Sequence, residues 1–137
     1  MKYLLDVNVL IAFGVTQHEF HQRVVEWIRS QHGSTFLTSS LTEIGFVRVV
    51  ASVAMYDLSV LQARSVLLGM KANATQPLTF LSDGNDISQL PAWVKTPRRT
   101  TDGHLLQLAR AHGAVLATLD GRIPGAYLIP GTVVGGQ

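Results

Sequence analysis

The sequence predicts an α/β domain in which helices cover both faces of a central, mostly parallel sheet. Short apolar runs recur along the chain, and longer amphipathic segments separate them. This alternation of strand and helix patterns is typical of a parallel sheet. A chain of 137 residues, of which 47% are hydrophobic, can bury one core but is too short for two. We therefore expect a single domain over residues 1–137.

The first half of the chain is expected to contain two strands and four helices. It opens with a continuous apolar run that reads as a buried strand. The second predicted helix carries Phe20, Val24, Trp27 and Ile28 on one face and stops at Gly33. The predicted strands are residues 2–6 and 34–39, and the predicted helices are 7–14, 18–33, 40–53 and 59–71.

The second half is expected to hold three strands, one helix and a long connection. The connection is rich in turn residues, and the helix that follows it ends at Gly113. The last strand is short and is expected at an edge of the sheet. The predicted strands are 77–82, 114–120 and 126–130, the helix is 102–113, and the connection is 82–99.

Composition excludes some classes of protein. Cysteine is absent, so the chain can form neither a disulfide framework nor a thiolate zinc site, which fits a cytoplasmic protein. The N-terminal apolar run resembles a signal peptide, but Asp6 and Asn8 interrupt it and no small-residue cleavage site follows. The apolar stretch 44–56 contains Arg48 and is too short to cross a bilayer. We expect no association with a membrane.

Four carboxylates lie where the chain is expected to turn from strand to helix: Asp6, Glu43, Asp102 and Asp120. In open parallel sheets ligands bind outside the carboxyl ends of the strands, so these acids can meet in one crevice. Crowded carboxylates resist ionisation unless a hard cation such as Mg²⁺ or Mn²⁺ binds among their oxygens. The pattern favours a metal-dependent hydrolase.

Each acid also has a purely structural interpretation. Asp6 could cap the helix that follows it. Glu43 fits a capping box with Ser40. Asp102 could complement the helix dipole, and Asp120 could be a turn residue. The capping and metal-binding roles can coexist at one position.

The charge distribution suits a polyanionic substrate. The formal net charge is +2, but without the four candidate ligands eleven Lys and Arg stand against five acids, a balance of +6. A basic surface around a metal-filled acidic crevice attracts phosphates. Arg98 and Arg99 close the long connection just before Asp102, where they could bind substrate phosphates or simply keep the loop soluble.

For other conspicuous side chains we favour a structural role over a functional one. His18 and His21 lack the spacing of a zinc protease and are expected on a solvated helix face. His104 could contact substrate but is expected at an exposed helix position. Trp93 could stack on a base, although packing against the domain is the commoner role of a loop tryptophan.

Three segments, LLDVNVLIAF, LTEIGFVR and TTDGHLLQLARAHGAVLATLDG, in this order and spacing, resemble the PIN-domain ribonucleases, and among these the VapC-type toxins of bacterial toxin–antitoxin pairs. The resemblance runs from residue 2 to about residue 130. It implies a three-layer α/β/α domain, Mg²⁺- or Mn²⁺-dependent endoribonuclease activity, dimerisation, and neutralisation by a cognate antitoxin.

The resemblance also assigns residues. Asp6, Glu43, Asp102 and Asp120 match the acidic site residues of the family, and Asn8 and Thr118 match its polar neighbours, placed to orient ligands, waters or substrate. We expect the first three acids to bind metal directly and Asp120 to bind through water or to complete a second metal position. The family usually has a polar residue and an aromatic after the last acid, whereas this chain has Gly-Arg-Ile-Pro at 121–124.

Two other functions remain open at this point. In a phosphatase-like or phosphoacceptor domain Asp6 would be a nucleophile, but Asn8 supplies no acid for protonation and no lysine follows a later strand as expected. The chain could also be a catalytically inactive PIN-like module that binds a partner. A separate expectation concerns association. The third and fourth predicted helices and their connection carry more apolar residues than one face can bury, so part of this surface should pair with a second copy or with an antitoxin segment: Phe46, Val49, Val50, Val53, Met55, Val60, Leu67 and Met70.

Overall fold

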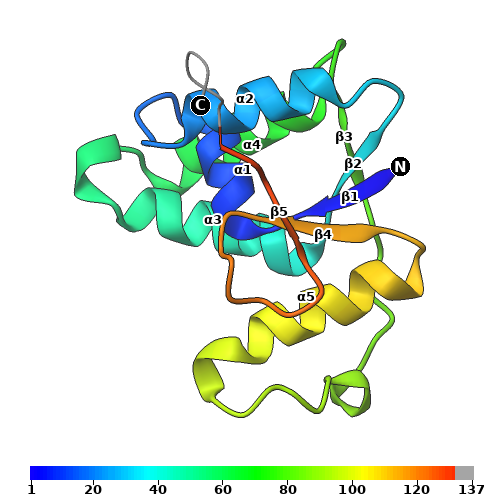
Figure 1. Ribbon diagram of the computed structural model, residues 1–137. Helices are drawn as coiled ribbons and strands as arrows, with labels where there is room; N and C mark the ends of the chain where they lie inside the picture. Colours follow the sequence, from blue (N-terminus) through cyan, green and yellow to red (C-terminus); the bar gives the residue numbers. More distant parts are fainter. Residues whose placement is uncertain (132–137) are drawn as a thin grey trace.

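The computed structural model describes residues 1–131, which fold around a five-stranded sheet (Figure 1). The strands lie in the order β3-β2-β1-β4-β5, and every neighbouring pair is parallel. The predicted α/β class with a parallel sheet is therefore confirmed. Residues 132–137 of the expected domain lie outside the described residues. The strands are β1 (Lys2–Leu5), β2 (Thr35–Thr38), β3 (Leu78–Phe80), β4 (Val115–Thr118) and β5 (Tyr127–Leu128).

Helices cover both faces of the sheet, which completes the three predicted layers. In Figure 1, α5 lies on one side of the strands and the helices α1 to α4 lie on the other. Short 3-10 turns, η1 (Ala54–Tyr56), η2 (Ile87–Gln89) and η3 (Pro97–Arg99), interrupt the connections. The helices are α1 (Val7–Gly14), α2 (His21–Ser30), α3 (Ser40–Ser52), α4 (Val60–Lys71) and α5 (Thr100–Ala111).

The two faces of the sheet build two cores because successive side chains of a strand point to opposite sides. In β1, Tyr3 and Leu5 pack into the core shared with α1 to α4, whereas Leu4 packs with the apolar face of α5. Leu4 and Leu5 are both fully buried. A central strand buried on both faces needs a continuous apolar run, which explains why the sequence of β1 does not alternate.

The strand order creates a topological switch point at the carboxyl ends of β1 and β4, and we call this region the crevice. The chain builds β1, β2 and β3 outward in one direction and then returns to the other side of β1 for β4 and β5. The direction of winding therefore reverses between β1 and β4, and open α/β sheets bind ligands at such a switch point. Asp6 directly follows β1, and Asp120 lies two residues beyond the end of β4.

The predicted helix over 18–33 is too long at both ends. Residues before His21 form a turn in which His18 Nδ1 accepts a hydrogen bond from the backbone of Phe20 at 3.0 Å. His21 Nδ1 lies 2.7 Å from the carbonyl oxygen of Ala12. Both histidines are half-buried, so their predicted place on a solvated helix face is wrong. The helix ends at Ser30, and Gly33 adopts a φ of 76°, which only glycine tolerates easily.

The predicted capping box of Ser40 and Glu43 is also wrong, because α3 is capped one residue earlier. Ser39 accepts a hydrogen bond from the backbone of Thr42, and the Thr42 hydroxyl accepts one from the backbone of Ser39. Threonine thus takes the role expected of glutamate, and Glu43 is available for other contacts.

No helix among residues 1–131 is long and apolar enough to cross a membrane.

Candidate active site

Asp6 lies at the centre of the crevice, at the junction of β1 and α1. Its Oδ1 accepts a hydrogen bond from the backbone of Val7 at 2.8 Å, so Asp6 does cap α1 as the structural interpretation held. Its Oδ2 accepts a hydrogen bond from the Thr118 hydroxyl, also at 2.8 Å. The side chain is buried, and burial raises the pKa of Asp6; repulsion by Asp102 and Asp120 adds to this, while the two hydrogen bonds oppose it.

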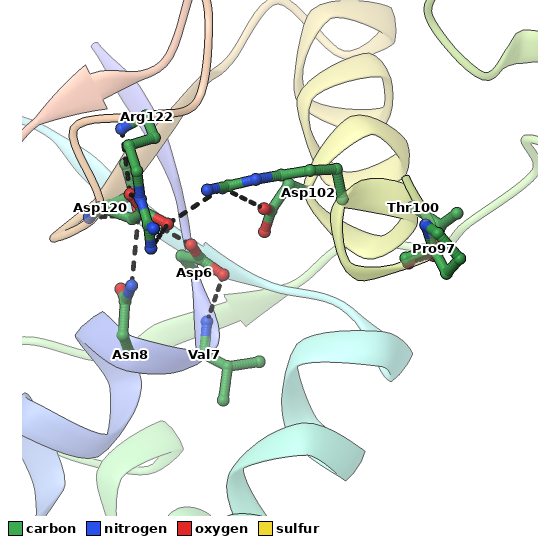
Figure 2. Close-up of polar contacts among 10 residues, drawn as sticks. Asp6, Val7, Asn8, Pro97, Thr100, Asp102, Asp120 and Arg122 are labelled. Atoms are coloured by element: carbon green, nitrogen blue, oxygen red, sulfur yellow. Dashed lines mark hydrogen bonds and ion pairs between the residues drawn. The ribbon is translucent and has the colours of Figure 1, made fainter. Parts of the chain in front are cut away.

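Asp102 and Asp120 reach the same crevice from α5 and from the end of β4 (Figure 2). A single nitrogen, Arg99 Nη1, lies 2.9 Å from Asp102 Oδ2 and 3.1 Å from Asp120 Oδ2. Arg99 is the last residue of η3, immediately before α5. Three acids that are far apart in the sequence therefore meet at the switch point, and a cationic side chain lies between two of them.

Asn8 and Thr118 hold this arrangement together. The Thr118 hydroxyl donates to Asp6 and accepts from the Asn8 amide at 3.3 Å and from the backbone of Asp120 at 3.0 Å. Asn8 Oδ1 in turn accepts from the backbone of Leu119 at 3.2 Å. Because Thr118 is buried and bonded on all sides, it fixes Asp6 relative to the end of β4. Asn8 and Thr118 therefore position Asp6 and Asp120 through hydrogen bonds.

Arg122 is a site residue that sequence reasoning missed. Its Nε lies 3.0 Å from Asp120 Oδ1 and its Nη2 lies 3.3 Å from Asp120 Oδ2. Hydrogen bonds from Arg122 are the main cause of a pKa of Asp120 far below the ordinary value. Asp120 also accepts from the backbone of Arg122, so it is a turn residue as well as a site residue. The position two residues after Asp120 was the available signal, because an aspartate commonly bonds to its neighbour at that spacing.

Glu43 has polar partners that differ from those of the other three acids. Its Oε2 accepts a hydrogen bond from the hydroxyl of Thr38, the last residue of β2, at 2.5 Å. The same oxygen is 2.7 Å from Lys71 Nζ, and that ammonium also lies 5.3 Å from the centre of the Phe80 ring. No sequence signal joins Glu43 to a lysine that lies 28 positions further along the chain.

The fit of a divalent ion is supported by the ligand chemistry and limited by the geometry. The donors are carboxylate oxygens, which Mg²⁺ and Mn²⁺ prefer. In residues 1–131, however, no three His, Cys, Asp or Glu side chains are grouped so that they could hold a metal ion as they stand. The positive charge at the crevice is instead supplied by Arg99 and Arg122, and at Glu43 by Lys71. The carboxylate oxygens thus suit a cation, and in this structure arginine and lysine side chains are the cations paired with them.

The structure also places Arg98, Trp93 and His104, the other side chains that the sequence analysis singled out. Arg98 is exposed on η3, beside the crevice. Trp93 packs against the core beneath α5, as favoured, although its buried Nε1 has no hydrogen-bond partner among the described residues. His104 is wrongly expected at an exposed position: it is half-buried and its Nε2 lies within hydrogen-bond distance of Asp83 Oδ2 in the long connection.

Comparisons with known proteins agree with this arrangement. The family model described as PIN domain matches residues 3–127. Ribonuclease VapC38 of Mycobacterium tuberculosis is 38% identical over 123 residues, which cover 85% of this chain and 84% of that protein. Ribonuclease VapC44 of the same organism is 34% identical over 126 residues, which cover 88% of this chain and 87% of that protein.

Solved structures are similar in fold. The crystal structure of Mycobacterium tuberculosis VapC20, described as a Sarcin-Ricin loop cleaving toxin, matches with a TM-score of 0.62 and 11% identity, covering 88% of this chain and 92% of that chain. VapBC2 from Rickettsia felis, bound to a DNA fragment from their promoter, matches with a TM-score of 0.59 and 17% identity over 93% of this chain and 97% of that chain. At these identities the likeness concerns the fold alone.

Proposed function

Because the chain belongs to the PIN-domain family, we propose that it is a metal-dependent endoribonuclease of the VapC type, the toxin of a type II toxin–antitoxin pair. One observation supports this more than any other. Asp6, Asp102 and Asp120 come from three distant parts of the chain and meet at the switch point of the sheet, where their charges interact. Ribonuclease names among relatives at 32–38% identity support the same activity.

The proposed reaction is hydrolysis of RNA phosphodiester bonds with Mg²⁺, or Mn²⁺, held by Asp6, Glu43, Asp102 and Asp120. When bound, such an ion supplies Lewis acidity and lowers the pKa of a coordinated water. The chain itself contributes orientation. Thr118 and Asn8 keep Asp6 and Asp120 in register, and the burial of Asp6 keeps water from competing for its oxygens.

Glu43 differs from the other members of this ligand set because it is paired with Lys71. It lies at the start of α3, and α3 approaches α1 closely because Gly45 has no side chain: a Cβ there would lie 2.6 Å from Val7 Cγ2. This close approach brings the first turn of α3 toward the residue after Asp6. We propose that Glu43 joins the site when Lys71 releases it.

Arg98 is proposed to bind substrate phosphates. It is exposed at the edge of the crevice and adjoins Arg99, which lies within it. A guanidinium recognises phosphate oxygens through paired hydrogen bonds. Such contacts fix the position of the backbone without reading the base sequence.

An antitoxin segment is the partner proposed for a groove between α3 and α4. The groove encloses about 600 Å³, and its apolar lining includes Ile44 and Val60, which are 65% and 64% exposed. Arg48 and Arg64 also line it, which favours a segment that is apolar on one side and acidic on the other. Glu43 lines the groove as well, so an occupant would reach this member of the proposed ligand set.

A second copy of the chain is proposed to cover other exposed apolar side chains. Met55 and Leu61 are 70% and 66% exposed. The surplus predicted from the sequence is smaller than expected, because Phe46, Val50 and Leu67 are buried in the core. Self-association is tested by light scattering, and a monomer at high concentration would contradict it.

The test of the function uses purified protein, a mixture of structured RNAs and a small phosphoester. We expect internal cleavage of RNA in Mg²⁺ or Mn²⁺, none in EDTA, and no release of phosphate from the small ester. Metal-dependent phosphate release without RNA cleavage would favour the phosphoacceptor alternative. Metal binding with neither activity would favour the inactive partner-binding module.

A further inference from the structure

We propose that Arg99 is a built-in counter-ion of the acid site that a divalent metal ion must displace, so that this residue sets how tightly the protein binds metal. The inference rests on the proposed metal-dependent function. A single atom, Arg99 Nη1, donates hydrogen bonds to both Asp102 Oδ2 and Asp120 Oδ2.

The guanidinium and a metal ion cannot share this position. Nη1 lies 2.9 Å and 3.1 Å from the two oxygens. A bound Mg²⁺ requires oxygens at about 2.0–2.1 Å with near-octahedral geometry. An ion bonded to both oxygens would lie within about 5 Å of Nη1 and would be repelled by the like charge of the guanidinium. Metal binding by Asp102 and Asp120 together therefore requires Arg99 to leave.

The competition between Arg99 and a metal ion depends on the net charge of the acids and their counter-ions. Asp6, Asp102 and Asp120 meet at the crevice, and Arg99 and Arg122 are the cations hydrogen-bonded to them among the described residues. With Arg99 in place, the three acids present less negative charge to an incoming ion. Its removal leaves Asp102 without this partner, whereas Asp120 keeps Arg122. The released carboxylates repel each other more strongly and attract a divalent ion more strongly.

Arg99 is held at the acid site by hydrogen bonds from a single nitrogen, which makes its displacement feasible. In the described part of the chain both of its hydrogen bonds to acids use Nη1, although a guanidinium carries five N–H donors. Its side chain is 18% exposed, so water reaches it. Once displaced, the guanidinium would remain beside Arg98 at the mouth of the site, where a phosphate of the substrate could replace the two carboxylates as its partner.

The test measures Mn²⁺ affinity by isothermal titration calorimetry in wild type, Arg99→Gln and the control Arg110→Gln. Arg110 lies in the last turn of the same helix, so the control removes the same charge at the far end of α5. We expect Arg99→Gln to lower the Mn²⁺ dissociation constant about tenfold or more, which corresponds to about 1.4 kcal/mol. The control should bind as wild type does. Without metal, Arg99→Gln should melt at a lower temperature than wild type, and Mn²⁺ should raise its melting temperature by more.

The possible results separate this inference from the proposed function. Equal Mn²⁺ affinity in wild type and Arg99→Gln overturns the inference and leaves the metal-dependent nuclease intact. No Mn²⁺ binding by either protein overturns both. Circular dichroism in EDTA checks folding, and Arg99→Lys serves if Arg99→Gln does not fold. Because an ammonium is a point charge without the planar fork, Arg99→Lys should also bind Mn²⁺ more tightly than wild type, by a smaller factor, and unchanged binding would overturn the inference.

Discussion

Asp102→Asn is the substitution that best separates a metal ligand from a structural residue. It keeps the shape of the side chain and removes one charge from the crevice. Asn can still accept a hydrogen bond from Arg99 Nη1, which lies 2.9 Å from Asp102 Oδ2 in the wild-type structure. The fold should therefore survive, while the affinity of the site for a divalent ion should fall.

The expected loss of stability is small. The side chains of Arg99 and Asp102 are 18% and 19% exposed, and ion pairs that solvent reaches contribute about 0.2–1 kcal/mol. Loss of a negative charge from the first turn of α5 costs a further 0.3–1 kcal/mol or so. Relief of the repulsion between Asp102 and Asp6 offsets part of this. We expect a net destabilisation of about 1 kcal/mol in the absence of metal, a fall in Tm of roughly 2–5 °C for a chain of this size.

The expected loss of activity is much larger. Removing a residue that only supports a metal ligand costs about 10–100-fold in metal affinity or activity, so removing a ligand should cost at least about 100-fold. The assay follows cleavage of a fluorescent RNA in Mg²⁺ and in EDTA, and thermal melting with and without Mn²⁺. Asp83→Asn is the matched control, because Asp83 is also 19% exposed and also pairs with a residue of α5, His104. The control should cleave RNA as wild type does.

A specific result would refute this reasoning. If Asp102→Asn cleaves RNA at the wild-type rate in Mg²⁺, and EDTA abolishes cleavage by both proteins, the proposed ligand set is wrong although the nuclease assignment stands. A stabilisation by Mn²⁺ as large as that of wild type would lead to the same conclusion.

Three further predictions follow from particular contacts. The pKa of Asp120 is lowered in the folded protein, so its ion pairs stabilise the fold fully above about pH 4, which is the pKa of an aspartate in the unfolded chain. This stabilisation is lost as the pH falls through the pKa of the folded state. Asp120→Asn should therefore lower the free energy of unfolding in urea titrations at pH 7, and lower it progressively less below pH 4. Arg98→Ala should reduce the slope of log RNA affinity against log salt concentration by about 0.7, one phosphate contact on a single strand, and an unchanged slope would remove Arg98 from the binding face. Gly45→Ala should destabilise the protein by about 1–2 kcal/mol in urea, because the added Cβ would lie 2.6 Å from Val7 Cγ2. Gly69→Ala is the control: a Cβ there would have nothing within 4 Å, so this substitution should stabilise the protein by about 0.5–1 kcal/mol. The opposite order of stabilities would contradict the close packing of α1 and α3.

Several features of the site could not be read from the sequence because they depend on contacts between distant segments. Arg99 was expected either to bind phosphate or to keep the loop soluble, and neither role indicated that it lies between two acids of the site. Glu43 was expected to bind metal with Asp6 and Asp102, and the sequence did not indicate its ion pair with Lys71 from the end of α4. His104 gave no sign of its ion pair with Asp83, which belongs to the connection before α5. Ion pairs of this kind form wherever folding brings opposite charges together, and no spacing in the sequence marks them.

The sequence by itself determined the alternation of strands and helices and the placement of Asp6 and Asp120 just after strands, whereas Glu43 and Asp102, expected at the same kind of position, lie in the first turns of α3 and α5. These depend on local properties: apolar periodicity, turn residues, and the preference of Asp for the residue before a helix, which Asp6 illustrates. Only the tertiary structure decided the order β3-β2-β1-β4-β5, and with it which acids meet. Asp6 meets Asp120 because β4 pairs with β1, and Glu43 pairs with Lys71 because α4 packs against α3. Strand pairing and the choice of counter-ion are settled by the packing of the whole chain, since each depends on segments that come together only when the sheet forms.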